Sequence, residues 1–599
     1  MESSDPPDSL YAQQQRTQLD LSVPWWQRNL LLNQPVLFGT WDGVFTTVMV
    51  NIFGIIVFLR MGWIVGTAGV VNSILLLIIC TSLALITVFS AIRIVERCRI
   101  QSGGIYFLVS HVLGGQIGGA VGLIYVFGQA VATGLVAVGF GESVAHFFGS
   151  ENALIIKASA IAVILFLTVI NAAGVSWVIR LQLILLSCLC LAAIDFVLGS
   201  LWTVDMEHGI NHFSTHRLRI NAEAHYDSFN CSHLGIDHAQ EEQSFFTVFG
   251  VFFANFLGVL AGVNMSGDLR EPHKSIPLGE LSALITSSSV CFVFIMILGC
   301  VVDRQWLLCD NLIQEKVSLT GFFFMIGLYI CSLSSVIGSL LGTPRVLQGI
   351  ASEGIIPILA PLSQGHGANR NPVMASVLMM GIACVFVLLG DLNTLAILST
   401  MPFLITYAFV NYAYVSLAMS NDLEYVTHAV SGETGISSSY GSMQGMVDND
   451  LDKLFPDERA RQTAHTEGSI VPMPETWYSM FNNRYISFTG CMINLLILLF
   501  INFWFAIVHF LAFAALYYYI GKVCPTCFPG VSQFSVPHMF RTAFSSLETL
   551  GLTTTSTGPT VLFGPTPADV STSQMNEQSA DYQQRKDYHH AENIQTQLD

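Results

Sequence analysis

The feature that most constrains this chain is a series of about twelve long apolar runs. A helix needs roughly 20 mostly apolar residues to cross a bilayer, and runs of that kind recur along the chain, near 43–65, 70–92, 104–143, 153–174, 177–201, 244–263, 279–302, 319–344, 373–390, 392–416, 485–502 and 503–521. We therefore predict an all-α polytopic membrane protein with twelve transmembrane helices. The third run is too long for one straight helix, so we expect a short tilted or re-entrant piece near Ser102–Gly115. The last two runs predict a C-terminal helical hairpin.

Composition supports a membrane protein and argues against other classes. Of the 599 residues, 52% are hydrophobic and only 11% charged, whereas soluble proteins carry about 25% charged residues. The net charge of −17 argues against nucleic acid, which would need a basic surface. The sequence has no paired nucleophile and base, no phosphate-binding loop and no metal cluster. We therefore expect no enzyme activity, no cofactor and no transition metal. The expected partners are the lipid bilayer and a small-molecule or ion substrate.

Basic residues in short loops predict the orientation, because they favour the cytoplasmic side. They follow the even-numbered spans, as Arg93, Arg97, Arg99, Arg180, Arg270, Lys274, Arg345 and Arg370. Both termini are then cytoplasmic, in a protein that we expect in the plasma membrane. The polar start Met1–Asp20 predicts no cleavable signal peptide.

The loop 202–243 then faces outward and carries the sequon Asn230-Cys231-Ser232, which predicts a glycan on Asn230. Cys231 and Cys309 both fall on this side and could pair. The scattered cysteines show no disulfide framework, however, and the unpaired state is the favoured interpretation.

Changes in composition divide the chain into five parts. We expect a cytoplasmic N-terminal segment at 1–40, a ten-helix core at 41–416, a disordered cytoplasmic linker at 417–483, the hairpin at 484–521 and a cytoplasmic tail at 522–599. The pair Cys524/Cys527 in the tail is weak evidence for a metal site, and chance or lipidation explains it better.

Two apolar runs contain polar and small residues that favour a broken helix. Asn51 and Gly54 interrupt the first run, and Asn255, Gly258 and Gly262 interrupt the sixth. Non-helical backbone at membrane depth is tolerated only where it lines a protein cavity. Transporters built from two inverted five-helix repeats place discontinuous helices at these two positions, where free carbonyls bind cations and helix N-termini attract anions. The alternative, that these are ordinary packing residues, is weakened because the two breaks occupy matched places.

Other polar residues in the spans have two interpretations each. Ser334 and Ser335 could offer hydroxyl oxygens to Na⁺, or simply bond carbonyls of their own helix. Tyr106 and Tyr407 could be ordinary interhelical hydrogen-bond donors. Buried acids are functional candidates by default, but Asp195 lies near a helix end and Glu142 is expected at the membrane interface.

Several segments are similar to the cation–chloride cotransporters, solute carrier family 12, within the amino acid–polyamine–organocation superfamily. They are VNIFGIIVFLRMGWIVG at Val50–Gly66, SGGIYFLVS at Ser102–Ser110, LAGVNMSGDL at Leu260–Leu269, TPRVLQ at Thr343–Gln348 and INFW at Ile501–Trp504. The resemblance covers about 40–420 and 480–521. It implies a LeuT-like 5+5 inverted repeat with discontinuous helices 1 and 6.

The resemblance also implies site residues. The matching sodium-site positions are Val50, Phe53, Cys331, Ser334 and Ser335. The positions for a substrate or anion are Asn51, Ile52, Gly54, Ile55, Ile56, Tyr106, Ala254, Leu257, Gly258, Val259, Leu260 and Tyr407. Among these, Ala254 and Leu257 replace a proline and a threonine that bind K⁺ in the family, which removes a coordinating oxygen.

These observations predict a secondary active transporter. We expect Na⁺ coupling and alternating access for an anionic or anion-bearing solute, either chloride or an organic solute such as an amino acid, polyamine or mononucleotide. One alternative is potassium–chloride symport. Another is a non-transporting partner of related carriers, and both a homodimer and association with such carriers stay open.

Overall fold

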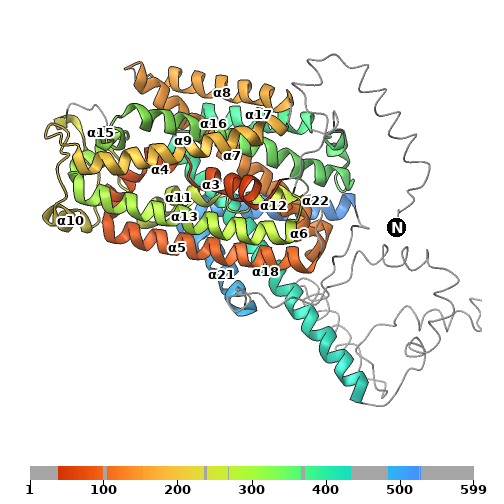
Figure 1. Ribbon diagram of the computed structural model, residues 1–599. Coiled ribbons are helices and arrows are strands. Elements are labelled where there is room, and N and C mark those ends of the chain that lie inside the picture. Colours follow the sequence, from red (N-terminus) through yellow and green to blue (C-terminus); the bar gives the residue numbers. More distant parts are fainter. Residues whose placement is uncertain are drawn as a thin grey trace, which may run out of the picture. The chain divides into compact units, whose positions relative to one another are not determined.

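The computed structural model describes residues 38–98, 104–149, 152–173, 175–234, 239–266, 269–365, 372–433 and 483–524, together with Cys527 and Gly530. These residues are almost entirely helical (Figure 1). Within these ranges, eleven helices are long and apolar enough to cross a membrane. Each of the twelve predicted spans coincides with a helix, but Val373–Leu389 has 17 residues and falls short of that length. The chain is therefore a helical polytopic membrane protein.

The first half of the structure contains the first five predicted spans. Its elements are the π-helical turn η1 (Thr40–Phe45) and the helices α3 (Thr46–Ile52), α4 (Ile55–Leu59), α5 (Met61–Arg97), α6 (Gly104–Leu113), α7 (Gly115–Phe147), α8 (Ala153–Ala173) and α9 (Val175–Trp202). Gly69 kinks α5 with a φ of 76°, so this helix holds the end of span one and all of span two. Gly114, at φ 94°, separates α6 from α7, as the predicted short piece requires.

The loop that follows the fifth span is partly structured. It contains α10 (Thr215–Ala222), the 3-10 turn η2 (Ser232–Leu234) and a two-stranded antiparallel sheet of β1 (Phe229–Asn230) and β2 (Ala239–Gln240). Cys231 and Cys309 form a disulfide in this region. This corrects the favoured sequence interpretation, because 78 residues separate two cysteines that the fold brings together. Asn230 is exposed, and its glycan stays a prediction.

The second half contains the remaining spans. Its elements are α11 (Phe245–Phe253), the 3-10 turn η3 (Ala254–Phe256), α12 (Ala261–Asn264), α13 (Pro272–Val301), α14 (Arg304–Cys309), α15 (Ile313–Val317), α16 (Phe322–Ser352), η5 (Pro357–Ser363), α17 (Val373–Leu389), α18 (Leu392–Glu433), α21 (Arg484–Ile501) and α22 (Phe503–Val523). Asn502 accepts a hydrogen bond from the amide of Phe505 and so starts α22, which separates it from α21; the hairpin arrangement of these two helices stays a prediction. Helix α18 continues to Glu433, past the predicted boundary at 416, and the rest of the expected linker lies outside the described residues.

Burial separates inner from outer helices. In the segments Thr40–Leu59, Gly115–Phe147 and Phe245–Asn264, 83%, 78% and 78% of the most apolar window is buried. The corresponding values for Ala153–Ile170 and Phe503–Val523 are 22% and 17%. A helix that exposes apolar side chains on most of its surface suits a lipid environment. Spans one, three and six therefore form the interior, and α8 and α22 lie at its edge.

Candidate functional site

The first span is interrupted at Phe53 and Gly54. Helix α3 ends at Ile52, Phe53 has a ψ of 55°, Gly54 is extended, and α4 begins at Ile55. The interruption leaves backbone carbonyls without their usual partners one turn further along. Two of them are contacted by α16: Ser335 donates to the carbonyl of Val50 at 3.2 Å, and the Cys331 thiol contacts that of Phe53 at 2.8 Å.

The predicted sodium-site residues therefore meet between α3 and α16. All five are buried. The Val50 carbonyl and the Ser335 hydroxyl are oxygens of the kind that hard cations prefer. Ser334 differs from Ser335, because its hydroxyl bonds the carbonyl of Cys331 in its own helix at 3.0 Å. The structure thus brings Val50, Phe53, Cys331 and Ser335 to one place. The fifth residue, Ser334, bonds within its own helix instead.

The sixth span is interrupted over a longer stretch. Helix α11 ends at Phe253, and residues 254–260 form a 3-10 turn and further turns before α12 begins at Ala261. The Tyr407 hydroxyl, from α18, lies 2.8 Å from the carbonyl oxygen of Phe256 and 3.1 Å from that of Leu257. This hydroxyl is therefore a hydrogen-bond donor to two carbonyls that, in a continuous helix, would accept hydrogen bonds from backbone N–H groups one turn further along. Both breaks that the sequence predicted are present.

The two interruptions touch each other. A Cβ atom placed on Gly258 would lie 2.3 Å from the Cβ of Asn51 and 3.3 Å from its carbonyl carbon. Non-bonded carbon atoms essentially never approach one another within 3.0 Å, so only glycine allows this approach. Asn51 is held from its other side, since its amide donates to the Thr47 carbonyl at 2.7 Å.

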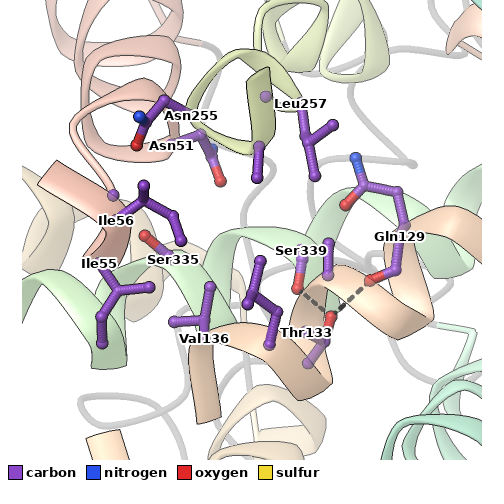
Figure 2. Close-up of a pocket in the computed structure, with 15 residues that line it drawn as sticks. Asn51, Ile55, Ile56, Gln129, Thr133, Val136, Asn255, Leu257, Ser335 and Ser339 are labelled. Carbon is purple, nitrogen blue, oxygen red and sulfur yellow. Dashed lines mark hydrogen bonds between the residues drawn. The ribbon is translucent and has the colours of Figure 1, made fainter. Parts of the chain in front are cut away.

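A cavity of about 50 Å³ lies beside this contact (Figure 2). One water needs about 10–15 Å³ by this measure, so there is room for a few waters. The lining combines spans one, three, six and eight: Asn51, Gly54, Ile55, Ile56, Gln129, Ala132, Thr133, Leu135, Val136, Ala254, Asn255, Leu257, Gly258, Ser335 and Ser339. Figure 2 shows the Thr133 hydroxyl between Ser339, at 2.6 Å, and the Gln129 carbonyl, at 2.8 Å. The polar lining residues are all uncharged.

A second, smaller cavity of about 20 Å³ shares Asn51, Gln129, Gly258 and Ser339 with the first. Its other lining residues are Thr47, Ala261, Asn264, Met265, Gly338, Gly342 and Thr343. Hydrogen bonds run from Gln129 to the Tyr125 hydroxyl at 2.9 Å and from Asn264 to the same hydroxyl at 2.5 Å. These bonds connect the third span to α12, the second helical piece of the sixth span.

The remaining predicted site residues fall into two groups. Ile52, Val259 and Leu260 are buried at the breaks without lining either cavity. Tyr106 lies elsewhere, and its hydroxyl bonds the Glu353 carboxyl just after α16. Burial raises the pKa of the Glu353 carboxyl, and the Tyr106 hydrogen bond partly offsets this.

Sequence reasoning missed several polar residues of the site. Gln129 and Thr133 line the first cavity, and their spacing of four places them on one helix face, which was the available signal. Arg60 was missed as well. This residue is 5% exposed, follows α4, pairs with Glu142 at 3.0 Å and donates to Asn393 at 2.9 Å. Glu142, expected at the interface, therefore holds α4, the second helical piece of span one.

Two interrupted helices around a polar cavity define a membrane protein of the permease class. A family model described as amino acid permease matches residues 43–431. The chain therefore belongs to the amino acid permease family. Its relatives are solute carriers and its family is one of permeases, which places it among transporter proteins and not among enzymes.

The curated proteins that this chain resembles include members of solute carrier family 12. Solute carrier family 12 member 8 of Homo sapiens is 48% identical over 396 residues, which are 66% of this chain and 54% of that protein. The Xenopus laevis member 8 is 45% identical, over 67% of this chain and 54% of that protein. Solute carrier family 12 member 2 of Homo sapiens is 32% identical, over 64% and 35%. The chain thus spans about half the length of the member 8 relatives that it matches.

One solved structure shows a weaker likeness. It is described as the substrate-bound outward-open state of a Na⁺-coupled sialic acid symporter. The TM-score is 0.43 at 11% identity, and the likeness covers 63% of this chain and 79% of that one.

Proposed function

We propose that this chain is a sodium-coupled secondary active transporter that moves an anionic or anion-bearing solute by alternating access. The proposal includes the finer architecture: two inverted five-helix repeats plus the hairpin, with Val373–Leu389 as the ninth of twelve membrane spans. The observation that carries it is the contact between the two interrupted spans at Asn51 and Gly258, beside a cavity that four spans line. Paired interruptions at the midplane are the usual place of substrate and ion binding in such carriers.

The sodium site would lie between α3 and α16. The Val50 and Phe53 carbonyls and the Ser335 hydroxyl are buried and close together. The Ser335 hydroxyl and the Cys331 thiol contact these carbonyls, and a bound Na⁺ would replace those contacts. Ser334 would contribute by turning its hydroxyl away from the Cys331 carbonyl.

The substrate would bind in the first cavity. Because the lining carries no charged side chain, an anionic group would be met by peptide N–H groups around Gly54–Ile56 and Gly258, with the amides of Asn51 and Gln129 nearby. A polyamine suits this lining least, because no carboxylate faces the cavity. The cavity has room for only a few waters, so an organic solute requires an opening movement. On one side, the ion pair between the buried Arg60 and the half-buried Glu142 would have to separate.

The test is uptake into vesicles that contain the purified chain, with and without a Na⁺ gradient, over chemically diverse labelled solutes. We expect Na⁺-stimulated uptake that the double substitution Ser334→Ala and Ser335→Ala abolishes. Ser332→Ala is the matched control, since its hydroxyl only bonds the Leu328 carbonyl of its own helix at 2.8 Å. Sodium-independent uptake that survives the double substitution would reject the coupling. No flux in vesicles, with altered flux of a co-expressed relative, would favour the non-transporting alternative.

Potassium–chloride symport is the second candidate, favoured by the identity to member 2 of the same carrier family. Ala254 and Leu257 count against it, because they put hydrocarbon groups in the cavity wall where a K⁺ ligand is expected. This candidate predicts chloride-dependent Rb⁺ uptake that a loop diuretic inhibits.

We also propose that the loop with the Cys231–Cys309 disulfide faces outward from the plasma membrane, with both termini in the cytoplasm. Disulfides form in oxidising compartments, which agrees with the distribution of basic residues. A glycosidase-sensitive mass shift on gels that Asn230→Gln removes would support this orientation. Reaction of the cysteine pair with cytosolic thiol reagents only would contradict it.

A further inference from the structure

Glu280 is a buried carboxyl that the proposed transport site does not use. It lies in the third turn of α13 and is 0% exposed. Its Oε1 accepts a hydrogen bond from the backbone N–H of Val263, in α12, at 3.2 Å. Its Oε2 is buried and has no hydrogen-bond partner among the described residues.

The Glu280 carboxyl is packed tightly against α12, the second helical piece of span six. A Cβ on Gly262 would lie 2.9 Å from Oε1 of Glu280 and 2.6 Å from a methyl carbon of Val44. Only a glycine lets α12 lie this close to α13. The contact therefore belongs to one arrangement of α12 and is lost when α12 moves.

Among the side chains that the structure describes, no cation compensates this carboxyl. The described titratable side chains on α13 and on the elements packed against it are Asp42, Arg60, Cys80, Arg93, Glu96, Arg97, Cys188, Cys190, Asp195, His216, Arg217, Arg219, His273, Lys274, Cys291 and Cys300. In the described part of the chain, none of them forms an ion pair with Glu280. The phenols of Tyr125 and Tyr407 lie within electrostatic range and carry no positive charge.

Asp195 offers a comparison, because it is a buried acid in the same protein whose two carboxylate oxygens both accept hydrogen bonds. It is 8% exposed in α9. One carboxylate oxygen accepts from the Thr320 hydroxyl at 3.0 Å and the other from the Thr320 amide at 3.4 Å. Two donors can support a negative charge. Glu280 has only one donor, so its charged form would keep a buried oxygen without compensation, which costs far more than a neutral group at the same place.

We propose that Glu280 is a proton-binding site that holds a proton while α12 lies against α13 and releases it when α12 moves away. This inference rests on the proposed transport function and makes the cycle proton-linked. On release, the O–H bond of the acid breaks, its electron pair stays on the carboxylate, and the proton passes to water that enters between the two helices. The Val263 N–H hydrogen bond is given up in the same movement.

Helix α12 is suited to this coupling. It has four residues and follows the turns at 257–260, so it is separated from α11 and is not part of one continuous helix. Val263 contacts Glu280, while Ala261 and Asn264 of the same short helix line the second cavity. A movement that frees the carboxyl therefore also reshapes that cavity.

The first experiment detects the proton directly. Infrared spectra of the purified full chain in lipid are recorded across the pH range, to follow the C=O stretch of protonated carboxyls. We expect a band that persists at neutral pH, is absent in Glu280→Gln and is retained in Asp195→Asn. Absence of the band in the unsubstituted protein overturns the proposal without any variant, and so does a band that Glu280→Gln leaves unchanged.

The second experiment measures the coupling. Ala261→Cys is labelled with a membrane-impermeant thiol reagent, against the background of the parent protein. Because the closed arrangement binds the extra proton, raising the pH favours the open one, by up to about tenfold per pH unit. We expect the labelling rate to rise with pH, to rise equally in combination with Asp195→Asn, and to become independent of pH with Glu280→Gln. A rise that persists with Glu280→Gln would overturn the proposal.

Neither experiment requires a transported solute. Failure of the sodium-dependent uptake test would reject the proposed function while leaving these results intact. A flat labelling profile beside sodium-dependent uptake would reject the proton site alone.

Discussion

The interruptions in spans one and six look alike in sequence but are held by different means. The first is short, and side chains of α16 contact its carbonyls through Ser335 and Cys331. The second covers seven residues, and one phenol from α18 supports it. The glycines differ as well. A Cβ on Gly54 would meet nothing nearer than 3.4 Å, whereas a Cβ on Gly258 would collide with Asn51.

The difference indicates a division of roles. In the proposed transport cycle, the first break would provide backbone carbonyls for a cation, together with the Ser335 hydroxyl of α16. The second break provides the close contact between the two interrupted spans and leads into α12, the short helix that we propose to move. A substitution at the second break should therefore have larger effects than its counterpart at the first.

The largest effect is expected for Gly258→Ala. The new methyl group would lie 2.3 Å from the Asn51 Cβ, and backbone on both sides limits relaxation. Overpacking of this kind costs about 3 kcal/mol of unfolding free energy, and we expect loss of uptake together with a lower melting midpoint. Gly54→Ala is the matched control for stability and should change the melting midpoint little. Equal effects of the two substitutions would remove the distinction between the breaks.

The second largest effect on stability is expected for Glu142→Gln, which tests how α4, the second helical piece of span one, is anchored through Arg60. Arg60 has 6% of its side chain exposed and would keep its charge with a weaker partner. We expect a loss of about 2 kcal/mol, the scale of a charge-assisted hydrogen bond, seen as a lower melting midpoint. Asp303→Asn breaks a pair with Arg217 in which Asp303 is 52% exposed, and should cost less than about 1 kcal/mol. A midpoint unchanged by Glu142→Gln would contradict the anchoring role.

Both breaks could be predicted because the signal is local. Asn and Gly inside an otherwise apolar run predict an interruption wherever the run later packs. Which glycine is indispensable could not be predicted, because the need at Gly258 arises from Asn51, about two hundred residues earlier in the chain.

The sequence analysis did not single out Glu280, and it misjudged Cys231, for the same reason. Glu280 lies near the start of its predicted run, close to Lys274, and so resembles an interfacial charge. Its burial depends on α12, which folds over it from another span. The Cys231–Cys309 disulfide depends on α14 approaching the loop before the sixth span, which neither segment reveals alone.

Tyr407→Phe probes the second break more gently. Without the hydroxyl, the carbonyls of Phe256 and Leu257 lose their common donor, at a cost of about 1 kcal/mol. Amide hydrogen exchange in residues 254–264 should accelerate roughly fivefold, which corresponds to that energy. Tyr329→Phe removes a comparable 3.1 Å bond to the Ser143 carbonyl, away from both breaks, and should leave exchange in this segment unchanged. If both variants accelerate it equally, Tyr407 has no special role there.

The smallest effect on stability is expected for a substitution of Glu315, which lies next to Gln314 in α15. Gln314 supports α4, the second helical piece of span one. Its side-chain amide donates to the Val57 carbonyl in α4 at 3.0 Å. Burial raises the pKa of the Glu315 carboxyl above its ordinary value of 4.5, and His146 partly offsets this. The folded protein then binds this proton more tightly than the unfolded chain. Stability is therefore lost as the pH rises from the ordinary value through the raised one.

Glu315→Gln removes that loss. Above this window the variant should be as stable as the unsubstituted protein or slightly more stable, by less than about 0.5 kcal/mol. The measurement is the melting midpoint of both proteins across the acidic range, where the unsubstituted protein should decline more steeply with rising pH. Parallel dependence of the two melting midpoints on pH would mean that the protonation of Glu315 does not affect the stability of α15 or of the first break that it contacts. The comparison would then depend on Arg60 and the α16 contacts alone.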